Sequence, residues 1–67
     1  MKTIKAGDVV RRRRVLLGID QRTLSEISGV AVHTLSNIEA GKGNPTVATL
    51  QRVLDALGMQ LRIQVKE

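Results

Sequence analysis

Three polar side chains lie close together in the stretch SGVAVHTLSNIEAG, residues 28–41: His33, Ser36 and Asn37. Each carries hydrogen-bond donors or acceptors, and their spacing brings them to one side of a helix. The same helix would bury Leu35 and Ile38 on its opposite side, so the polar groups have no task in a core. They are the first candidates for chemistry with a partner.

The ionisable residues do not form a catalytic or metal-binding constellation. His33 is the only histidine, Cys is absent, and the six Asp and Glu residues are scattered along the chain. No nucleophile–base pair and no metal-ligand spacing can be assembled from them. We therefore predict that the protein is not an enzyme and that it has no catalytic residue, metal or cofactor.

Composition favours a negatively charged partner. The 67 residues include 11 Lys and Arg against six Asp and Glu, a formal charge of +5, and such a balance favours a polyanion. Phe, Tyr and Trp are absent, so the stacking platforms of single-strand and RNA readers are missing. No apolar run is long enough for a signal segment or a membrane span. We expect one small cytoplasmic domain without a membrane partner.

Four short helices are predicted from glycines that follow periodic segments: Gly18, Gly29, Gly41 and Gly58. The predicted helices run from Gly7 to Leu17, Gln21 to Ser28, Val32 to Ala40 and Val47 to Leu57, with Asp20 and Thr46 as N-caps of the second and fourth. Their periodicity predicts a core of Val10, Leu17, Leu24, Ile27, Val30, Leu35, Ile38, Val47, Leu50, Val53, Leu54 and Leu57.

The residues after Gly58 follow a strand pattern instead, because the hydrophobic period changes from 3.6 to 2. Met59, Leu61, Ile63 and Val65 alternate with polar residues. A lone strand leaves its backbone groups unpaired. We therefore expect a second copy to supply the same strand across a two-fold axis, with these four residues as the dimer interface. The alternative is a frayed tail.

The turn between the second and third predicted helices contains only three residues, Gly29, Val30 and Ala31. Such a turn holds two helices at a steep angle and pushes the second one outward, which is helix-turn-helix geometry. A helix presented in this way fits the DNA major groove, where Asn can contact adenine twice and Val can touch a thymine methyl. We predict base contacts from Val32, His33, Ser36 and Asn37; the alternative is a solvated polar face.

Five stretches of the chain resemble helix-turn-helix domains of the Cro/C1 type, the XRE family: RRRRVLLGIDQ at 11–21, LSEISGV at 24–30, TLSNIE at 34–39, GKGNP at 41–45 and TLQRVLDALG at 49–58. The resemblance implies an all-α fold, a compact four-helix lambda-repressor-like domain over residues 1–58. The C-terminal β-strand at 59–67 would then pair across a homodimer. It also implies a nucleoid-associated protein of a prokaryote or phage.

The resemblance further implies contacts with DNA phosphates. Gln21 matches a Gln at the positive end of the second helix that contacts a phosphate in this family. Lys42, Gly43 and Asn44 match a loop that lies along the DNA backbone. The full set of expected phosphate contacts is Gln21, Arg11, Arg12, Arg22, Thr34, Lys42 and Asn44.

The run of four arginines at 11–14 cannot be one DNA-facing patch, because consecutive residues spread around a helix. Arg14 and Glu39 match a family pair that forms a largely buried salt bridge between the first and third helices, so Arg14 is assigned a structural role. Two positions depart from the family pattern: Ala31 replaces a frequent Ser or Thr cap, and Val32 replaces a polar residue. The missing cap costs about 1 kcal/mol.

The C-terminal stretch LGMQLRIQVKE is similar to that of HipB-type antitoxins, in which such a strand pairs across the dimer. This resemblance implies a homodimeric repressor that binds double-stranded DNA at a pseudo-palindromic operator of its own toxin–antitoxin operon. It also implies a HipA-type kinase toxin as partner. Two alternatives stay open: a general XRE-family regulator without a toxin, and a DNA-binding module that does not distinguish sequences.

Overall fold

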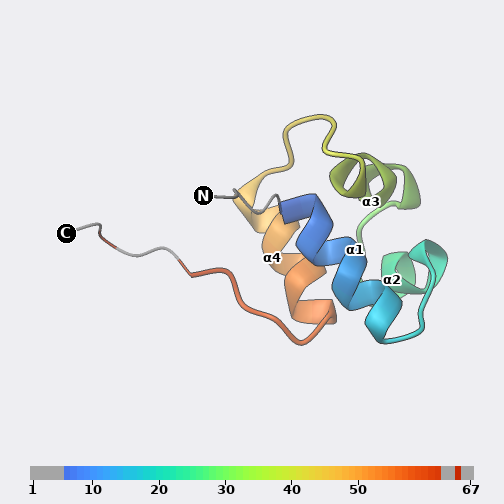
Figure 1. The fold of residues 1–67 in the computed structure, drawn as a ribbon. Coiled ribbons are helices and arrows are strands. Elements are labelled where there is room, and N and C mark those ends of the chain that lie inside the picture. The colour runs from blue at the N-terminus through green and yellow to red at the C-terminus, as the bar shows by residue number, and fades with distance from the viewer. Residues whose placement is uncertain (1–5, 63–64, 66–67) are drawn as a thin grey trace.

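Four helices make up the regular structure of the computed structural model, which describes residues 6–62 and 65. Helix α1 spans Ala6–Leu16, α2 Gln21–Ser28, α3 Val32–Glu39 and α4 Val47–Ala56. Helix α1 packs on α3, and α2 packs on both α3 and α4 (Figure 1). The all-helical prediction is confirmed for the described residues, and each predicted helix agrees with an observed one to within one residue at either end.

Local residues set the helix ends. Asp20 Oδ1 accepts a hydrogen bond from Thr23 N at 2.8 Å, and Thr46 Oγ1 accepts one from Thr49 N at 3.0 Å, so α2 and α4 are capped as predicted. Helix α3 follows Ala31 without a side-chain cap. The glycines predicted after helix ends, Gly18, Gly29, Gly41 and Gly58, all have a left-handed φ of 70–73°.

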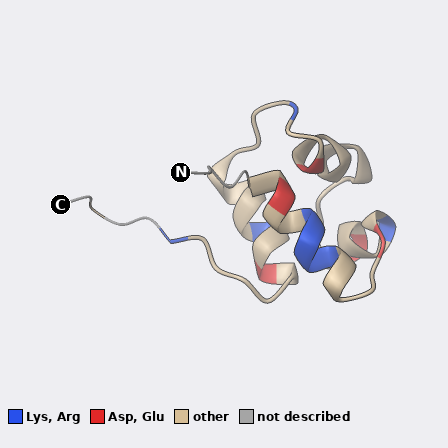
Figure 2. Cartoon of the chain, in the orientation of Figure 1, with Lys and Arg blue, Asp and Glu red and all other residues tan. Residues whose placement is uncertain are grey.

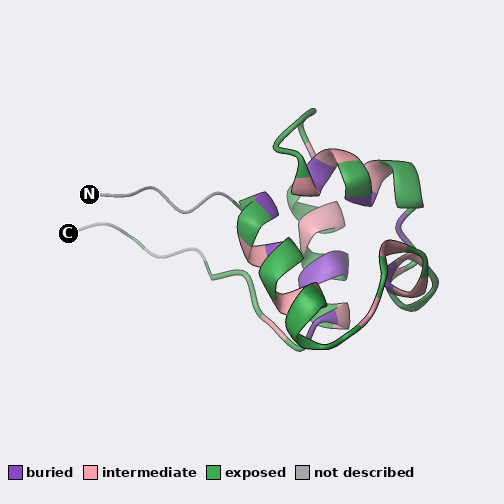
Figure 3. Ribbon diagram, turned by 45° about the vertical axis from the view of Figure 1, so that its right-hand side comes forward, coloured by how far each residue is buried: buried purple, intermediate pink, exposed green. Residues whose placement is uncertain are grey.

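The core is aliphatic and lies where the four helices meet (Figure 3). Its fully or almost fully buried members are Val10, Leu24, Val30, Leu35, Ile38, Val53, Leu54 and Leu57. Leu50 and Met59 pack against this cluster while partly exposed. Every one of the eight buried side chains is among those predicted from periodicity, so the apolar stripes were assigned to the correct helix sides.

Three residues predicted for the core are exposed, and for them the prediction was wrong. Ile27 is 59% exposed, Val47 51% and Leu17 46%. Each stands at a helix end: Ile27 is next to last in α2, Val47 is first in α4, and Leu17 follows α1. Periodicity places a residue on the apolar side of its helix, but at the edge of a small domain no neighbouring element covers that side.

The strand predicted for 59–67 is absent from the described part of the tail, residues 59–62 and 65. Met59 lies in the turn that closes the end of α4, where its N–H donates to Leu54 O at 2.8 Å and its side chain packs on the core. Leu61 and Val65 are exposed, and Ile63 lies outside the described residues. A strand needs backbone partners, and the single chain offers none in its described part.

Close approach of α1 to α3 depends on a glycine. Gly7 is buried, and a Cβ added to it would collide with the carbonyl oxygen of Ile38. The first turn of α1 therefore lies directly against the backbone of the last turn of α3. This contact helps to set the position of α3, the helix that carries the three polar residues of interest.

Candidate nucleic-acid interface

Helix α3 presents a polar outer side to solvent. Val32, His33 and Ser36 are exposed there and Asn37 is half-buried, whereas Leu35 and Ile38 on the inner side are buried. None of the four outer side chains is Lys, Arg, Asp or Glu. A helix side rich in neutral donors and acceptors, with one apolar residue at its start, suits contacts with base edges.

The turn before α3 makes this side available. Gly29 takes a left-handed φ of 73°, which a residue with a side chain rarely adopts, and its N–H donates to Ser25 O at 2.9 Å. The Ser28 hydroxyl accepts a hydrogen bond from Val30 N at 3.2 Å, while the Val30 side chain is buried. Three residues thus reverse the chain and anchor it in the core between α2 and α3.

His33 and Asn37 interact one helical turn apart. Asn37 Nδ2 lies 3.4 Å from His33 Nε2, so the amide donates when that ring nitrogen carries no proton. The interaction uses one amide hydrogen of Asn37. The other hydrogen and the carbonyl oxygen stay available, and these are the two groups that a double contact with adenine requires.

A small polar hollow lies beside Asn37. It has a volume of about 130 Å³, and Thr34, Lys42 and Asn44 help to line it. The loop after α3 is held there by its backbone, because Lys42 N donates to Asn37 O at 2.8 Å. The structure therefore brings three of the expected phosphate-contact residues next to an expected base reader.

Two further expected phosphate contacts stand at the start of α2. Gln21 is its first residue and is half-buried, and Arg22 follows it and is exposed. The N–H groups of this first turn point outward and carry the positive end of the helix dipole. The hydrogen bond from the Thr23 backbone N–H lowers the pKa of the Asp20 cap, so this carboxylate is ionised at neutral pH.

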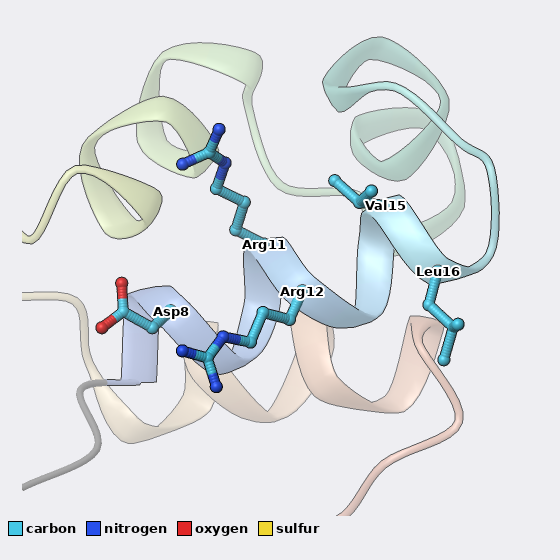
Figure 4. A pocket seen from close by; sticks show the side chains of 5 residues that line it. All are labelled: Asp8, Arg11, Arg12, Val15 and Leu16. Carbon is cyan, nitrogen blue, oxygen red and sulfur yellow. The ribbon is translucent and has the colours of Figure 1, made fainter.

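Arg11 and Arg12 lie elsewhere. Both are exposed on the outer side of α1, where they line a separate hollow with Asp8, Val15 and Leu16 (Figure 4). Neither residue lines the hollow beside α3. Of the seven expected phosphate contacts, these two are not brought together with the others around Asn37.

Arg14 and Glu39 join α1 to the end of α3. Arg14 Nε and Nη2 donate to the two carboxylate oxygens of Glu39 at 2.8 and 2.9 Å, and Arg14 Nη1 donates to Ile19 O at 2.9 Å. The side chains are 15% and 6% exposed. Such paired, planar geometry orients both groups.

The pKa shifts of this pair are those of a bound ion pair. Burial by itself raises the pKa of Glu39, but the hydrogen bonds from Arg14 and Gln21 and the positive charge of Arg14 together outweigh it and hold that pKa below its ordinary value. The hydrogen bond with Glu39 raises the pKa of Arg14. Both groups are therefore charged at neutral pH, and the pair fixes the C-terminal end of α3 relative to α1.

Arg13 has a structural contact that the sequence did not indicate. Its Nε donates to Leu57 O at 3.0 Å, at the end of α4. The last carbonyls of a helix lack partners within it, and a cation is favourable at that end. No sequence spacing signals this contact, because the two residues are 44 positions apart.

Positive charge surrounds α3 and is missing from it (Figure 2). Basic residues stand on three other segments: Arg11–Arg14 on α1, Arg22 on α2 and Lys42 in the loop after α3. The only charged residue of α3 is Glu39, which is paired with Arg14. Long-range attraction to a polyanion and neutral hydrogen bonding thus come from different elements.

The turn, the outward α3 and the cations around it define a helix-turn-helix unit, and comparisons with known proteins agree. A sequence model described as helix-turn-helix matches residues 10–64. The chain is 39% identical over 44 residues to the HTH-type transcriptional regulator PuuR of Escherichia coli, and equally to that of Shigella flexneri. It is 42% identical over 50 residues to an HTH-type transcriptional regulator of Haemophilus influenzae.

The alignment with PuuR covers 66% of this chain and 24% of PuuR. The alignment with the Haemophilus protein covers 75% of this chain and 51% of that protein. The chain therefore spans about a quarter to a half of the length of these relatives. It belongs to the helix-turn-helix family of the Cro/C1 or XRE type, which is not a class of enzymes.

The described residues, 6–62 and 65, include neither a membrane-spanning helix nor a group of metal ligands. None of their helices is long and apolar enough to cross a membrane. No group of three or more His, Asp or Glu side chains among them is placed to hold a metal ion.

Proposed function

We propose that the protein is a sequence-specific regulator of transcription that binds double-stranded DNA and represses. Helix α3 enters the major groove and reads bases through Val32, His33, Ser36 and Asn37. The observation that carries this proposal is the hydrogen-bonding outer side of α3, free of Lys, Arg, Asp and Glu, together with Lys42 in the loop beside it and Arg22 at the start of α2. Phosphate attraction supplies affinity without sequence information, and neutral donors and acceptors supply discrimination.

Two sets of residues meet phosphates in this proposal. Thr34, Lys42 and Asn44 surround the hollow beside α3, and Gln21 and Arg22 begin α2. Arg11 and Arg12 reach DNA only from the outer side of α1. These two residues therefore contribute more to the long-range attraction of DNA than to the positioning of the protein on the duplex.

The proposed active form is a homodimer. Residues 1–58 form the DNA-binding domain, and residues 59–67 form a strand that pairs with its copy in the second chain. The alternation of Met59, Leu61, Ile63 and Val65 supports this, as does the exposure of Leu61 and Val65 in the single chain. A two-fold dimer requires a pseudo-palindromic operator whose half-sites are about 34 Å apart, or a multiple of that.

A more detailed form of the proposal is a HipB-like antitoxin with a HipA-type kinase toxin as partner, which regulates its own operon. The likeness of the stretch LGMQLRIQVKE supports it. Copurification with a HipA-type kinase encoded beside the gene, and growth rescue on coexpression, test this form. Failure of both leaves a general regulator of the same family.

The experiment for base reading is a fluorescence-anisotropy titration with labelled duplex from upstream of the gene and with a scrambled duplex. We expect a preference of about a thousandfold or more, with two chains bound per duplex. Similar affinity for both duplexes would overturn sequence reading and leave a non-specific module.

Two variants separate the roles of the residues. Asn37→Ala weakens binding to the specific duplex about 10- to 100-fold, because it removes a base contact. Its affinity for the scrambled duplex stays nearly unchanged. The matched control Lys42→Ala weakens binding to both duplexes. It also lowers the slope of log affinity against log salt concentration by about 1, the value for one lost phosphate contact. Equal losses on both duplexes for Asn37→Ala would exclude it as a base reader.

Dimer formation has its own test. Leu61→Lys should convert the dimer to a monomer in sedimentation equilibrium, because it places like charges across the two-fold axis. Val47→Lys, at an exposed apolar position outside the tail, is the control and keeps the dimer. A monomeric wild-type chain would contradict the proposed strand pairing.

A further inference from the structure

The outer side of α1 carries an apolar and basic surface that takes no part in the proposed contacts around α3. Its hollow has a volume of about 510 Å³ and is lined by Asp8, Arg11, Arg12, Val15 and Leu16 (Figure 4). Leu16 is 74% exposed and Val15 60%. We call these five residues the α1 surface. Two large neighbouring apolar side chains this exposed leave area that a partner of matching chemistry would bury.

The charges of the α1 surface are unbalanced. Among the described residues the only ion pair is Arg14–Glu39, so Arg11, Arg12 and Asp8 form none with another described residue. In Figure 4 Arg11 extends toward the side where α3 lies, whereas Arg12 and Leu16 extend toward the opposite side. The two guanidinium groups thus lie on either side of α1, one helical turn before the apolar pair, and the surface has a single carboxylate, Asp8.

Three occupants fit this surface poorly. DNA phosphates gain nothing from Val15 and Leu16, which need an apolar partner. A second α1 surface would bring a net positive charge against its own copy. The C-terminal tail carries Arg62 and Lys66 against one acidic residue, Glu67, so its net positive charge is unfavourable beside Arg11 and Arg12.

We propose that the α1 surface docks an acidic amphipathic helical segment of another protein. Two or three apolar side chains of that segment would cover Val15 and Leu16, and carboxylates beside them would pair with Arg11 and Arg12. This is the helix-in-groove mode, in which apolar anchors give affinity and flanking charges give orientation. The proposal does not depend on sequence reading by α3, because the two surfaces lie on different helices.

The test uses a defined probe. A synthetic helical peptide of about 18 residues, long enough to hold a helix, carries Leu at i, i+3 and i+7 with Glu beside them. A second peptide has Lys in place of each Glu. We expect the acidic peptide to bind with a Kd of about 100 μM or tighter and to shift the amide resonances of α1. The lysine peptide should bind much more weakly.

Matched variants locate the site. Leu16→Ser should weaken the acidic peptide about fivefold or more, the effect of truncating a contributing interface residue. Val47→Ser removes a similarly exposed apolar side chain on α4 and should change nothing. Arg12→Glu should reverse the preference between the two peptides, and Arg52→Glu on α4 should not. Leu16→Ser keeps its affinity for the operator duplex, since Leu16 is not part of the DNA interface.

Several outcomes would overturn the proposal. Equal binding of both peptides, or no change with Leu16→Ser, removes the surface as a docking site. Dissociation of a dimer by Leu16→Ser would mean that a second copy covers it. Binding to phosphatidylglycerol vesicles that matches peptide binding would make the surface a lipid site, which its two-residue apolar area disfavours.

Discussion

Arg13 and Arg14 on the inner side of α1 donate hydrogen bonds to other parts of the domain, whereas Arg11 and Arg12 on its outer side are exposed. The four residues are adjacent and of one type, so their chemistry differs only through helix phase. The inner pair reaches α4 and α3 and holds elements together. The outer pair faces solvent, where a guanidinium can attract a partner. Repeated charge in a sequence therefore need not mean one charged patch.

The largest effect on stability should come from removing the side chain of Arg14, on the inner side of α1. Arg14→Ala leaves the Glu39 carboxylate, 6% exposed, without its partner, and we expect it to lower the free energy of unfolding by about 3 kcal/mol. Arg12→Ala, on the outer side, should change it by less than about 0.5 kcal/mol. Urea unfolding of both variants measures the difference. Equal midpoints would abolish the distinction between the two sides of α1.

A smaller loss is expected where α1 approaches α3 most closely. Gly7→Ala adds a Cβ that collides with Ile38 O, and we expect a cost of about 2 kcal/mol. At an uncrowded helix position the same change would stabilise. Gly18→Ala is the control for backbone strain alone, because a Cβ there meets nothing within 4 Å while φ is 70°. In thermal melts, the melting temperature of Gly7→Ala should be lower than that of the wild type and that of Gly18→Ala.

Arg13 should contribute less than Arg14. Arg13→Gln removes one charge-assisted hydrogen bond, to Leu57 O at 3.0 Å, and strands no buried charge. We expect a loss of about 1 kcal/mol, measured by urea unfolding beside Arg12→Gln. A loss as large as that of Arg14→Ala would mean that the end of α4, not the α1–α3 ion pair, limits the stability of the domain.

The smallest effects concern pH. Glu39 and Asp20 have pKa values below their ordinary values of 4.5 and 3.8 in the folded chain. Each therefore contributes stability above its ordinary pKa, and that contribution is lost as pH falls through the lowered one. The melting temperature should fall on acidification below about pH 4.5. Glu39→Gln should make this fall shallower, and Asp20→Asn, which keeps a cap acceptor, should do so to a smaller degree.

If the melting temperature of Glu39→Gln fell with pH as steeply as that of the wild type, the acid sensitivity could not be assigned to the Arg14–Glu39 pair. Asp20→Asn supplies the matched comparison, because it removes a carboxylate that is capped but lies outside the α1–α3 contact.

Most of the fold was predictable because it is local. The glycines at helix ends, the Asp20 and Thr46 caps and the period of the apolar residues act within a few positions of one another. The exposed positions of His33 and Ser36 on α3 follow from the same periodicity, since they lie opposite Leu35 and Ile38. The Arg14–Glu39 pair came from family resemblance, because no local pattern links residues 25 positions apart.

By itself, the sequence determined the number of helices in the described chain, their limits and the side of each that is apolar, since these depend on short-range hydrogen bonding and periodicity. Tertiary structure alone decided that Ile27 and Val47 stay exposed, that Arg13 reaches Leu57 O, and that Lys42 and Asn44 meet Asn37 beside a hollow. Coverage of a helix end and contacts between distant segments depend on how helices pack, and packing is a property of all the elements together.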